Sequence, residues 1–452
     1  MPATTYLATR VRALLLGNTQ WTGRPTTLYL GLLSEAPTAA GTYTELVGLG
    51  YARRSMSSSD WHVYNGTVIN KAINNWPAPA TDDWASATHI GVFSAATNGN
   101  LLCWSSLTQA ITITKLGTAS LEAGAFSMTP GGPIGELAAH KLLRHLFLNA
   151  AWTWSYSAGG AANLFYLGIG TNSDNLQLYG EPLPLVGATA TAYARGTIAN
   201  TTAGWPATTS DPTKASNATA ITNVPAATAD WNQLSNMALL NGPIRTGSIT
   251  YDQTGSSQTI VVTHASHGLA ITHPLYASQS GTYARSGYDV TITTEQPHGY
   301  SVGQRVYCDF SAGTGGTAVD GCWKVTAATA LTLTVTNSAT GTITDGTVTI
   351  SRPQHVDIFV TGASGLAVSR RYALCNLGDA SNGVGVPGAT TTGKFTLEAE
   401  STDDLTGGSG ITCVYSPADV WLQTALTSAI TINTGANPTA PANQLVFGVA
   451  TA

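Results

Sequence analysis

The chain has little charge. Only 10% of its 452 residues are Asp, Glu, Lys or Arg, against roughly 25% in an average soluble protein. The 19 basic and 24 acidic residues are spread along the chain, and the net charge is -5. Nucleic-acid-binding faces and polybasic membrane-binding segments need clustered positive charge. We therefore expect no nucleic-acid partner and look for partners among proteins and glycans.

Long apolar runs are also missing. No stretch approaches the roughly 18 apolar residues of a transmembrane helix, and the first residues lack the charged-then-apolar order of a signal peptide. These absences predict that the chain does not insert into a membrane. They also predict that it is assembled in a cytoplasm.

Cysteine is scarce. The five cysteines are an odd number and show no paired Cys-x-x-Cys spacing, which argues against a structural zinc site. Buried free thiols are the favoured interpretation. The alternative is a disulfide between Cys308 and Cys322, which flank a Gly-rich turn and would need an oxidising environment such as a released particle.

Gly, Thr, Ser, Ala and Asn replace the missing charge, a composition typical of short strands joined by many turns. One pattern occurs twice, because residues 28–33 (Leu-Tyr-Leu-Gly-Leu-Leu) recur as residues 165–170 (Phe-Tyr-Leu-Gly-Ile-Gly). Four further matches follow in the same order: Tyr51-Ala-Arg53 with Tyr193-Ala-Arg195, Trp61 with Trp205, residues 73–77 with 221–225, and Asp83-Trp84 with Asp230-Trp231. Five ordered matches indicate a duplicated unit.

Each copy is preceded by apolar residues at helical spacing. They are Leu7, Val11, Leu14 and Leu15 before the first copy, and Ala139, Leu142, Leu143 and Leu146 before the second. His140 and His145 lie in the second helical segment and are expected to be partly exposed. The predicted fold is mainly β, with two β-sandwich units each opened by a short helix.

The second copy breaks off before its end. In the first copy, residues 89–113 pass through an Asn98-Gly99 turn between two strands, whereas in the second copy the match stops near residue 243 and resumes at residues 419–432. We interpret the intervening residues as an insertion into a hairpin turn, where insertions are well tolerated. The predicted domains are a first sandwich at 1–131, a second at 132–243 plus 417–452, and an inserted all-β, projecting module at 244–416. Strands are expected in the module at 259–263, 288–293, 304–307, 331–336 and 347–350.

Arg53 and Arg195 are the most specific polar match between the copies. An arginine in both copies predicts a role in the fold or in packing between units, such as a stacked or bidentate guanidinium. Trp84 and Trp231 recur at matched positions, which favours the core. Trp323 lies in the insertion and is a candidate stacking platform for a sugar or protein partner.

His298-Gly299 and His267-Gly268 each follow a predicted strand. Histidine is a common metal ligand, but no carboxylate or cysteine stands at ligand spacing beside either pair. We therefore favour a turn in which Gly takes a positive φ. Neither a metal nor a cofactor is expected.

The sequence offers no convincing catalytic group. Five carboxylates could supply a glycosidase pair, which needs two carboxyls roughly 5 to 10 Å apart: Glu45, Glu181, Asp82, Asp83 and Asp230. Nothing in the sequence brings two of them together, and neither a Gly-x-Ser-x-Gly elbow nor a phosphate-binding Gly-Lys motif occurs. The prediction is that the protein is not an enzyme.

The first copy resembles a unit found in virion structural proteins of tailed bacteriophages, usually described as tail fibre proteins. The resemblance rests on residues 28–33, residues 45–54 (Glu-Leu-Val-Gly-Leu-Gly-Tyr-Ala-Arg-Arg), residues 84–93 and the return strand at residues 99–104, and it covers about residues 1–130. The second copy departs from it, because Thr191-Ala192 replaces the Gly before the Tyr and the hairpin is open. His298 and the residues after it resemble small β modules of phage appendages more weakly.

The resemblance implies a structural component of a virion, in a tail fibre, collar or baseplate, assembled in the host cytoplasm. Its partners would be other virion proteins and copies of itself in a symmetric homo-oligomer, with a trimer as one candidate. Host surface glycans or a receptor are further candidate partners. Three alternatives stay open: a capsid decoration or head fibre protein, a receptor- or glycan-binding module, and a glycan-degrading enzyme.

Overall fold

The computed structural model describes most of the first 131 residues and separate segments of the remainder. The described residues are 3–48, 50–76, 82–131, 134–153, 163–170, 195–222, 231–245, 250–252, 259–264, 267, 276–353, 355–361, 367–376, 394–399, 411–416, 420–432 and 439–448. The chain is mainly β, as predicted from its sequence, with two α-helices among these residues.

Both helices lie where the apolar spacing predicts them. Helix α1 spans Thr5–Gly17. Thr4 caps its start, because the Thr4 hydroxyl accepts a hydrogen bond from the Leu7 N–H at 3.3 Å, and Asn18 caps its end in the left-handed region. Helix α2 spans Glu136–Phe147 and carries an acidic residue in its first turn and two basic residues in its last, which suits the helix dipole. Neither helix is long and apolar enough to cross a membrane.

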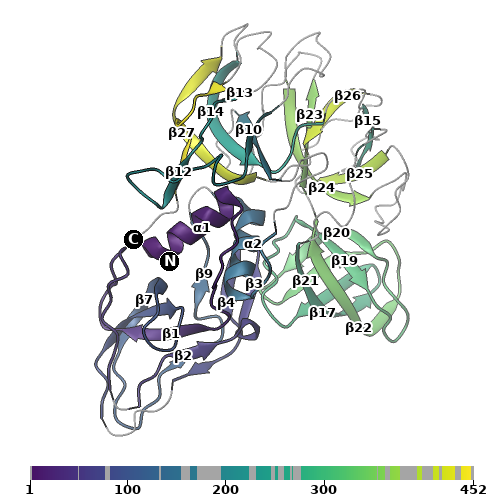
Figure 1. The fold of residues 1–452 in the computed structure, drawn as a ribbon. Helices are drawn as coiled ribbons and strands as arrows, with labels where there is room; N and C mark the ends of the chain where they lie inside the picture. The colour runs from purple at the N-terminus through teal and green to yellow at the C-terminus, as the bar shows by residue number, and fades with distance from the viewer. Residues whose placement is uncertain are drawn as a thin grey trace. The chain divides into compact units, whose positions relative to one another are not determined.

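The first sandwich contains one four-stranded antiparallel sheet in the order β2-β1-β6-β7, of which Figure 1 labels β1, β2 and β7. Its strands are β1 (Leu28–Leu33), β2 (Arg54–Met56), β6 (Ala87–Phe93) and β7 (Leu101–Ile111). A smaller sheet has the order β3-β4-β9, and a short pair joins β5 to β8. These strands are β3 (Trp61–Tyr64), β4 (Thr67–Asn70), β5 (Asn74–Asn75), β8 (Ser120–Leu121) and β9 (Ser127–Met128).

The same arrangement of strands occurs again later in the chain. A second four-stranded sheet has the order β11-β10-β14-β27, and two-stranded sheets join β12 to β29 and β13 to β28. Its strands are β10 (Leu164–Gly170), β11 (Gly196–Ala199), β12 (Lys214–Ser216), β13 (Ile221–Thr222), β14 (Trp231–Leu240), β27 (Val420–Ile432), β28 (Thr439–Ala440) and β29 (Val446–Gly448). The matching strands follow one another in the same order in both sets, which agrees with the repeat read from the sequence.

The strands between β14 and β27 form two closed six-stranded barrels. In sequence, all strands of the inner barrel lie between two strands of the outer barrel, as the colours of Figure 1 show. The outer barrel has the order β15-β16-β25-β24-β23-β26: β15 (Thr250–Asp252), β16 (Thr259–Thr263), β23 (His355–Thr361), β24 (Ala367–Asn376), β25 (Lys394–Ala399) and β26 (Ile411–Ser416). The inner barrel has the order β17-β18-β21-β20-β19-β22: β17 (Tyr276–Ser286), β18 (Asp289–Thr294), β19 (Arg305–Phe310), β20 (Gly321–Ala328), β21 (Thr332–Thr336) and β22 (Thr342–Arg352). Each strand predicted in the insertion overlaps one of these strands.

Alternating side chains build the core of the inner barrel. In β18, Val290, Ile292 and Thr294 are buried, whereas the residues between them are exposed. The inward positions of the other strands complete one apolar cluster. Because alternate residues of a strand point to opposite faces, the sequence alternation alone specifies which face is inside.

Cys308 and Cys322 are buried free thiols, in agreement with the favoured interpretation, and the alternative of a disulfide between them is wrong. Cys322 pairs with Tyr307 and Cys308 pairs with Gly321 across β19 and β20. Directly opposed residues share a face and neighbouring residues alternate, so the two thiols point to opposite faces of the barrel wall. Burial raises the pKa of the Cys308 thiol above its ordinary value.

The chain divides into two compact units. One consists of Met1–Trp154, Ala199–Ala220 and Ala440–Ala452, and the other of Ser155–Ile198 and Ile221–Thr439. Their boundaries differ from those of the repeat, so the repeat-based domains remain a prediction.

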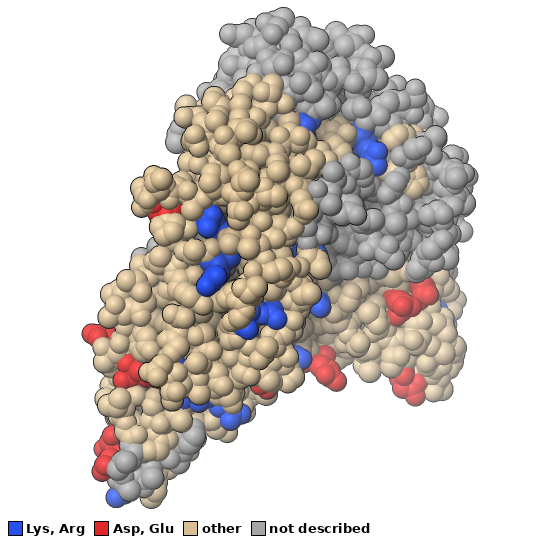
Figure 2. Space-filling model, viewed as in Figure 1, with Lys and Arg blue, Asp and Glu red and all other residues tan. Residues whose placement is uncertain are grey.

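In the view of Figure 2, charged side chains are separated by uncharged residues over most of the described surface.

Candidate functional site

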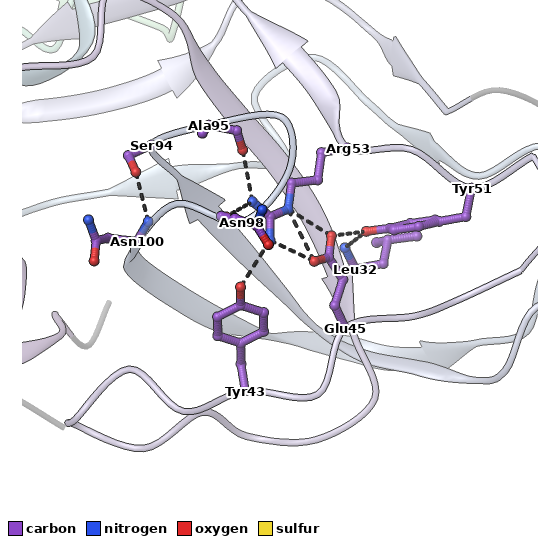
Figure 3. A network of polar contacts seen from close by, with 9 residues as sticks. All are labelled: Leu32, Tyr43, Glu45, Tyr51, Arg53, Ser94, Ala95, Asn98 and Asn100. Atoms are coloured by element: carbon purple, nitrogen blue, oxygen red, sulfur yellow. Dashed lines mark hydrogen bonds and ion pairs between the residues drawn. The ribbon is translucent and has the colours of Figure 1, made fainter.

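Arg53 is the centre of a polar network in the first sandwich (Figure 3). Its Nε donates to the Glu45 carboxylate at 2.9 Å, and Nη2 donates to the same carboxylate at 2.7 Å and to the Tyr43 hydroxyl at 3.1 Å. Its Nη1 donates to the carbonyls of Ala95 at 2.8 Å and Asn98 at 2.6 Å. All five guanidinium N–H groups therefore have acceptors, a geometry that a lysine ammonium cannot reproduce.

The ion pair of this network is largely buried. The side chains of Arg53 and Glu45 are 4% and 18% exposed, and the guanidinium carbon lies 3.6 Å from the centre of the Phe93 ring. Burial alone would lower the pKa of Arg53, but hydrogen bonds and charge from Glu45 hold it above its ordinary value. The arginine therefore stays charged, stacked on an aromatic ring and paired with its carboxylate.

Tyr51 ties the network to the main sheet. Its hydroxyl donates to Glu45 at 2.8 Å and accepts from the Leu32 N–H at 2.9 Å, in strand β1. Burial, and then the Glu45 charge, raise the pKa of Tyr51. The neutral phenol thus satisfies a backbone donor of β1 and one lone pair of the carboxylate.

Two glycines make room for Phe93. Gly31 and Gly91 stand opposite each other in β1 and β6. A Cβ at Gly31 would lie 2.7 Å from the Phe93 ring and 2.9 Å from Glu45, and one at Gly91 would lie 2.9 Å from the same ring. The Gly of the repeated Leu-Tyr-Leu-Gly motif is thereby explained by close packing.

The Arg53 network fixes the hairpin between β6 and β7. The turn closes through the Ser94 N–H to the Asn100 carbonyl at 3.0 Å and the Asn100 N–H to the Ser94 hydroxyl at 2.8 Å. Asn98 and Gly99 take positive φ values of 54° and 67° at its tip. Arg53 holds two carbonyls of this loop, which attaches the hairpin to the segment containing Tyr43 and Glu45.

Arg195 makes the corresponding contact in the second copy. It is buried, and its Nη1 donates to the Gly242 carbonyl at 3.0 Å. Gly242 lies two residues after the end of β14, just as Ala95 lies two residues after the end of β6. The two arginines therefore bind the same carbonyl of the repeat, one at the start of a short hairpin loop and the other where the chain leaves for the barrels.

The barrels leave and rejoin neighbouring strands. Leu240, the last residue of β14, pairs with Val420, the first residue of β27. In the first copy, Phe93 pairs with Leu101 across the short loop. Residues 241–419 thus occupy the position of the loop Ser94–Asn100.

Of the two matched tryptophans, Trp84 and Trp231, only Trp84 has a described side chain. Trp84 is 1% exposed and packs edge-to-face on Tyr51 at 5.1 Å, so it belongs to the core beside the network. Trp231 begins β14 opposite Ile432, and its side chain lies outside the described residues.

Trp323 and His298 are both internal to the inner barrel. Trp323 is 8% exposed and its indole N–H donates to the Val319 carbonyl at 3.1 Å, so it offers no surface stacking platform. His298 is 1% exposed, and its Nδ1 accepts from the Tyr300 N–H at 3.0 Å. The other ring nitrogen therefore carries the proton and faces the Thr332 carbonyl at 3.1 Å. Gly299 has a φ of 70°, which gives the residue pair the geometry of a turn.

The residues that the structure describes contain no group of three His, Cys, Asp or Glu side chains that could hold a metal ion. Glu45 is engaged by Arg53, and Asp83 accepts from the Lys115 N–H. Gly268, Glu181 and Asp230 lie outside the described residues. The His267 ring packs edge-to-face on Phe395.

The expected partial exposure of the two histidines in α2 is wrong. His140 and His145 are 2% and 4% exposed rather than partly exposed, because α2 is covered along most of its length. Tyr43 and the pair Gly31 and Gly91 were not recognised as parts of the Arg53 network. Glu45 stands eight residues before Arg53, but Gly187 stands eight residues before Arg195, so the repeat carries no signal for these partners.

Comparison with known proteins finds a family to which the first copy is similar. Residues 2–129 match a family model described as Podophage GP4 fiber I protein gp80. The match covers the sandwich that holds the Arg53 network and stops before α2. No curated protein matches the chain.

Proposed function

We propose that this protein, which carries a virion fibre unit of tailed phages over residues 2–129, is a tail-associated structural component in a fibre, collar or baseplate. In this proposal the duplicated sandwich (1–131, and 132–243 plus 417–452) mediates assembly. The inserted barrels (244–416) project from it and contact the host surface. A virion fibre role and association with other virion components follow from the family match.

The observation that carries the proposal is the way the insertion is attached. Strands β14 and β27 remain paired through Leu240 and Val420, and Arg195 binds the carbonyl that Arg53 binds in the uninterrupted copy. An insertion that leaves the parent hairpin paired can extend into solvent without disturbing the sandwich. The barrels are therefore the part of the chain free to contact something other than the virion.

The host contact we propose is with a glycan or a protein receptor, and the chain works in a symmetric homo-oligomer, with a trimer as the first candidate. Virion parts must match cyclic neighbours, which favours closed symmetry. No chemical step is assigned to the protein, and its proposed role is structural.

The test is a phage whose chain has residues 241–419 replaced by the loop Ser94–Asn100. We expect this chain to enter particles at the wild-type copy number, and the particles to adsorb to host cells at least about tenfold more slowly. A second phage lacking only residues 276–352, the inner barrel, separates the two barrels and is the matched control for deletion itself. Unchanged adsorption of both phages would remove the host-contact role.

Two further readouts separate the alternatives. Immunogold labelling of the chain on tailless heads would make it a head fibre or decoration protein. Loss of binding to a glycan array by the purified deletion chain would identify a glycan as the host contact, whereas competition by host outer-surface protein would identify a receptor.

A further inference from the structure

Helix α2 covers the small sheet of the first copy, although in sequence it opens the second. A Cβ built on Gly66, in the turn between β3 and β4, would lie 3.2 Å from the Cβ of Ala139 in α2. At the other end of the helix, Phe147 packs edge-to-face on Trp61 of β3 at 4.9 Å and lies 6.4 Å from Phe126. Trp61 and Phe147 are both buried, so this helix completes the core of the small sheet.

Helix α1 does the converse. Its start is fixed in the first copy, where the Thr4 N–H donates to the Leu102 carbonyl of β7 at 2.9 Å. Its end meets the second copy, because α1 contacts β12 and a Cβ built on Gly17 would lie 3.0 Å from the Thr202 methyl group. The helix that opens the first copy therefore packs on the small sheet of the second.

The segments that follow the two helices also cross. Asn18 ends α1 in the left-handed region with a φ of 43°, and Asn149, two residues after the end of α2, has a φ of 57°. The Asn18 amide oxygen accepts from the Trp152 indole at 3.1 Å, and the Asn149 amide donates to the Thr26 carbonyl at 2.8 Å. Each helix end thus binds the chain that follows the other helix.

Such reciprocity characterises a two-fold, self-complementary interface, in which a patch on one partner meets the same patch on the other. We propose that the two copies form a helix-exchanged pair, in which the small sheet of each copy is completed by the helix of the other. The surface that each copy offers therefore fits a second copy of the same unit, and the duplicated chain supplies both partners. This proposal does not depend on the virion role.

The exchange makes a prediction opposite to that of two independent tandem domains. Damage to α1 should loosen the small sheet of the second copy, more than 180 residues away in sequence, and damage to α2 should loosen that of the first. Gly17→Val and Ala139→Leu in the full-length chain place extra atoms directly into the two contacts, where overpacking is destabilising.

Hydrogen exchange read by mass spectrometry tests this. Peptides containing Asn443 and Leu445 report the second copy, and peptides containing Gly124 and Phe126 report the first. For Gly17→Val we expect exchange at least about tenfold faster in the second-copy peptides with the first-copy peptides unchanged. For Ala139→Leu we expect the reverse. Faster exchange confined to the helix's own copy in both variants would overturn the proposal.

Two safeguards keep the test decisive. If the larger substitutions prevent folding, Gly17→Ala and Ala139→Val apply smaller perturbations to the same contacts, and the same crossed pattern is expected. Gly17→Cys with Thr202→Cys should form a cross-link inside one chain on oxidation. A cross-link between two chains on a non-reducing gel would show that the helix is exchanged between chains and would overturn the internal pairing.

Discussion

Asn70 and Asn217 make the same hydrogen bonds in the two copies of the unit. Both are fully buried. The Asn70 side-chain amide donates to the carbonyls of Ala72 at 2.9 Å and Glu122 at 2.8 Å, and its oxygen accepts from the Phe126 N–H at 2.9 Å. One side chain therefore joins the end of β4 to the segment that leads into β9.

The second copy repeats this arrangement across the insertion. The Asn217 amide donates to the carbonyls of Thr219 at 2.9 Å and Pro441 at 2.8 Å, and its oxygen accepts from the Leu445 N–H at 2.9 Å. The last two partners follow the barrels in sequence. The final segment of the chain thus takes the place that residues 122–126 take in the first copy.

Substitution of either asparagine should lower the unfolding free energy of the protein, and by a similar amount at both positions. Asn70→Ala and Asn217→Ala each remove three hydrogen bonds of a fully buried side chain, one of them to the N–H of a buried residue, Phe126 or Leu445, which predicts a loss of about 3 kcal/mol in unfolding free energy. Urea unfolding measures it, with the exposed Thr118→Ala as control. A loss below about 0.5 kcal/mol for Asn217→Ala would contradict the equivalence of the two sites.

Arg53 should be irreplaceable by lysine. Arg53→Lys keeps a positive charge but cannot serve five acceptors or stack flat on Phe93, and Arg53→Met leaves Glu45 buried without its partner, which predicts a loss of about 3 kcal/mol. The neighbouring exposed Arg54→Ala is the matched control, with an expected change within about 0.5 kcal/mol. Chemical denaturation compares the variants.

The double variant Arg53→Met with Glu45→Leu should be more stable than Arg53→Met alone, because no buried charge is left unpaired. A double variant less stable than the single one would show that the Arg53 network acts through something other than this ion pair.

Gly31→Ala tests why the repeated motif contains glycine. The added methyl group would lie 2.7 Å from the Phe93 ring, so we expect a loss of about 1–3 kcal/mol from overpacking. Gly131→Ala is the control, since a Cβ there meets nothing within 4 Å. Equal melting temperatures for the two variants would reject the packing explanation.

His298 should make the inner barrel sensitive to acid. Burial lowers the pKa of His298 below its ordinary value of about 6.5, and protonation would turn the acceptor that binds the Tyr300 N–H into a donor. As the pH falls below about 6.5 the unfolded chain takes up a proton before the folded chain does, so stability decreases.

Hydrogen exchange of peptides containing Tyr300, measured between pH 8 and pH 5 and corrected for intrinsic rates, checks this. His298→Asn should lower the stability of the barrel at pH 8 and flatten its pH dependence. His145→Gln, which lies in another part of the chain, should leave the pH dependence in these peptides unchanged. A wild-type barrel equally protected at both pH values would count against the role of His298.

The sequence was informative where the structure is local. The helices follow from apolar spacing, the strands of the inner barrel from alternation, and the mainly β class from composition. The repeat was visible because it rests on aromatic and glycine positions that pack closely, such as Gly31 and Trp61. These features need only neighbouring residues to be recognised.

The remainder depends on contacts between distant segments. Nothing in the local pattern of β16 indicates that it pairs with β25, with the whole inner barrel lying between them in sequence. The sequence left a disulfide between Cys308 and Cys322 open for the same reason, since strand register decides which way the two thiols point. For Arg53, the sequence identified the residue but not its partners, because Phe93, Ala95 and Asn98 come from another hairpin.

The central claim is that the chain is a structural part of the virion, and its presence in purified particles tests this most directly. Cryo-electron microscopy and quantitative mass spectrometry of gradient-purified virions should find the chain at a fixed copy number on the tail, with two matching sandwiches per chain and the barrels pointing outward. Its absence from intact particles, or its presence only as free protein in the lysate, would contradict the account.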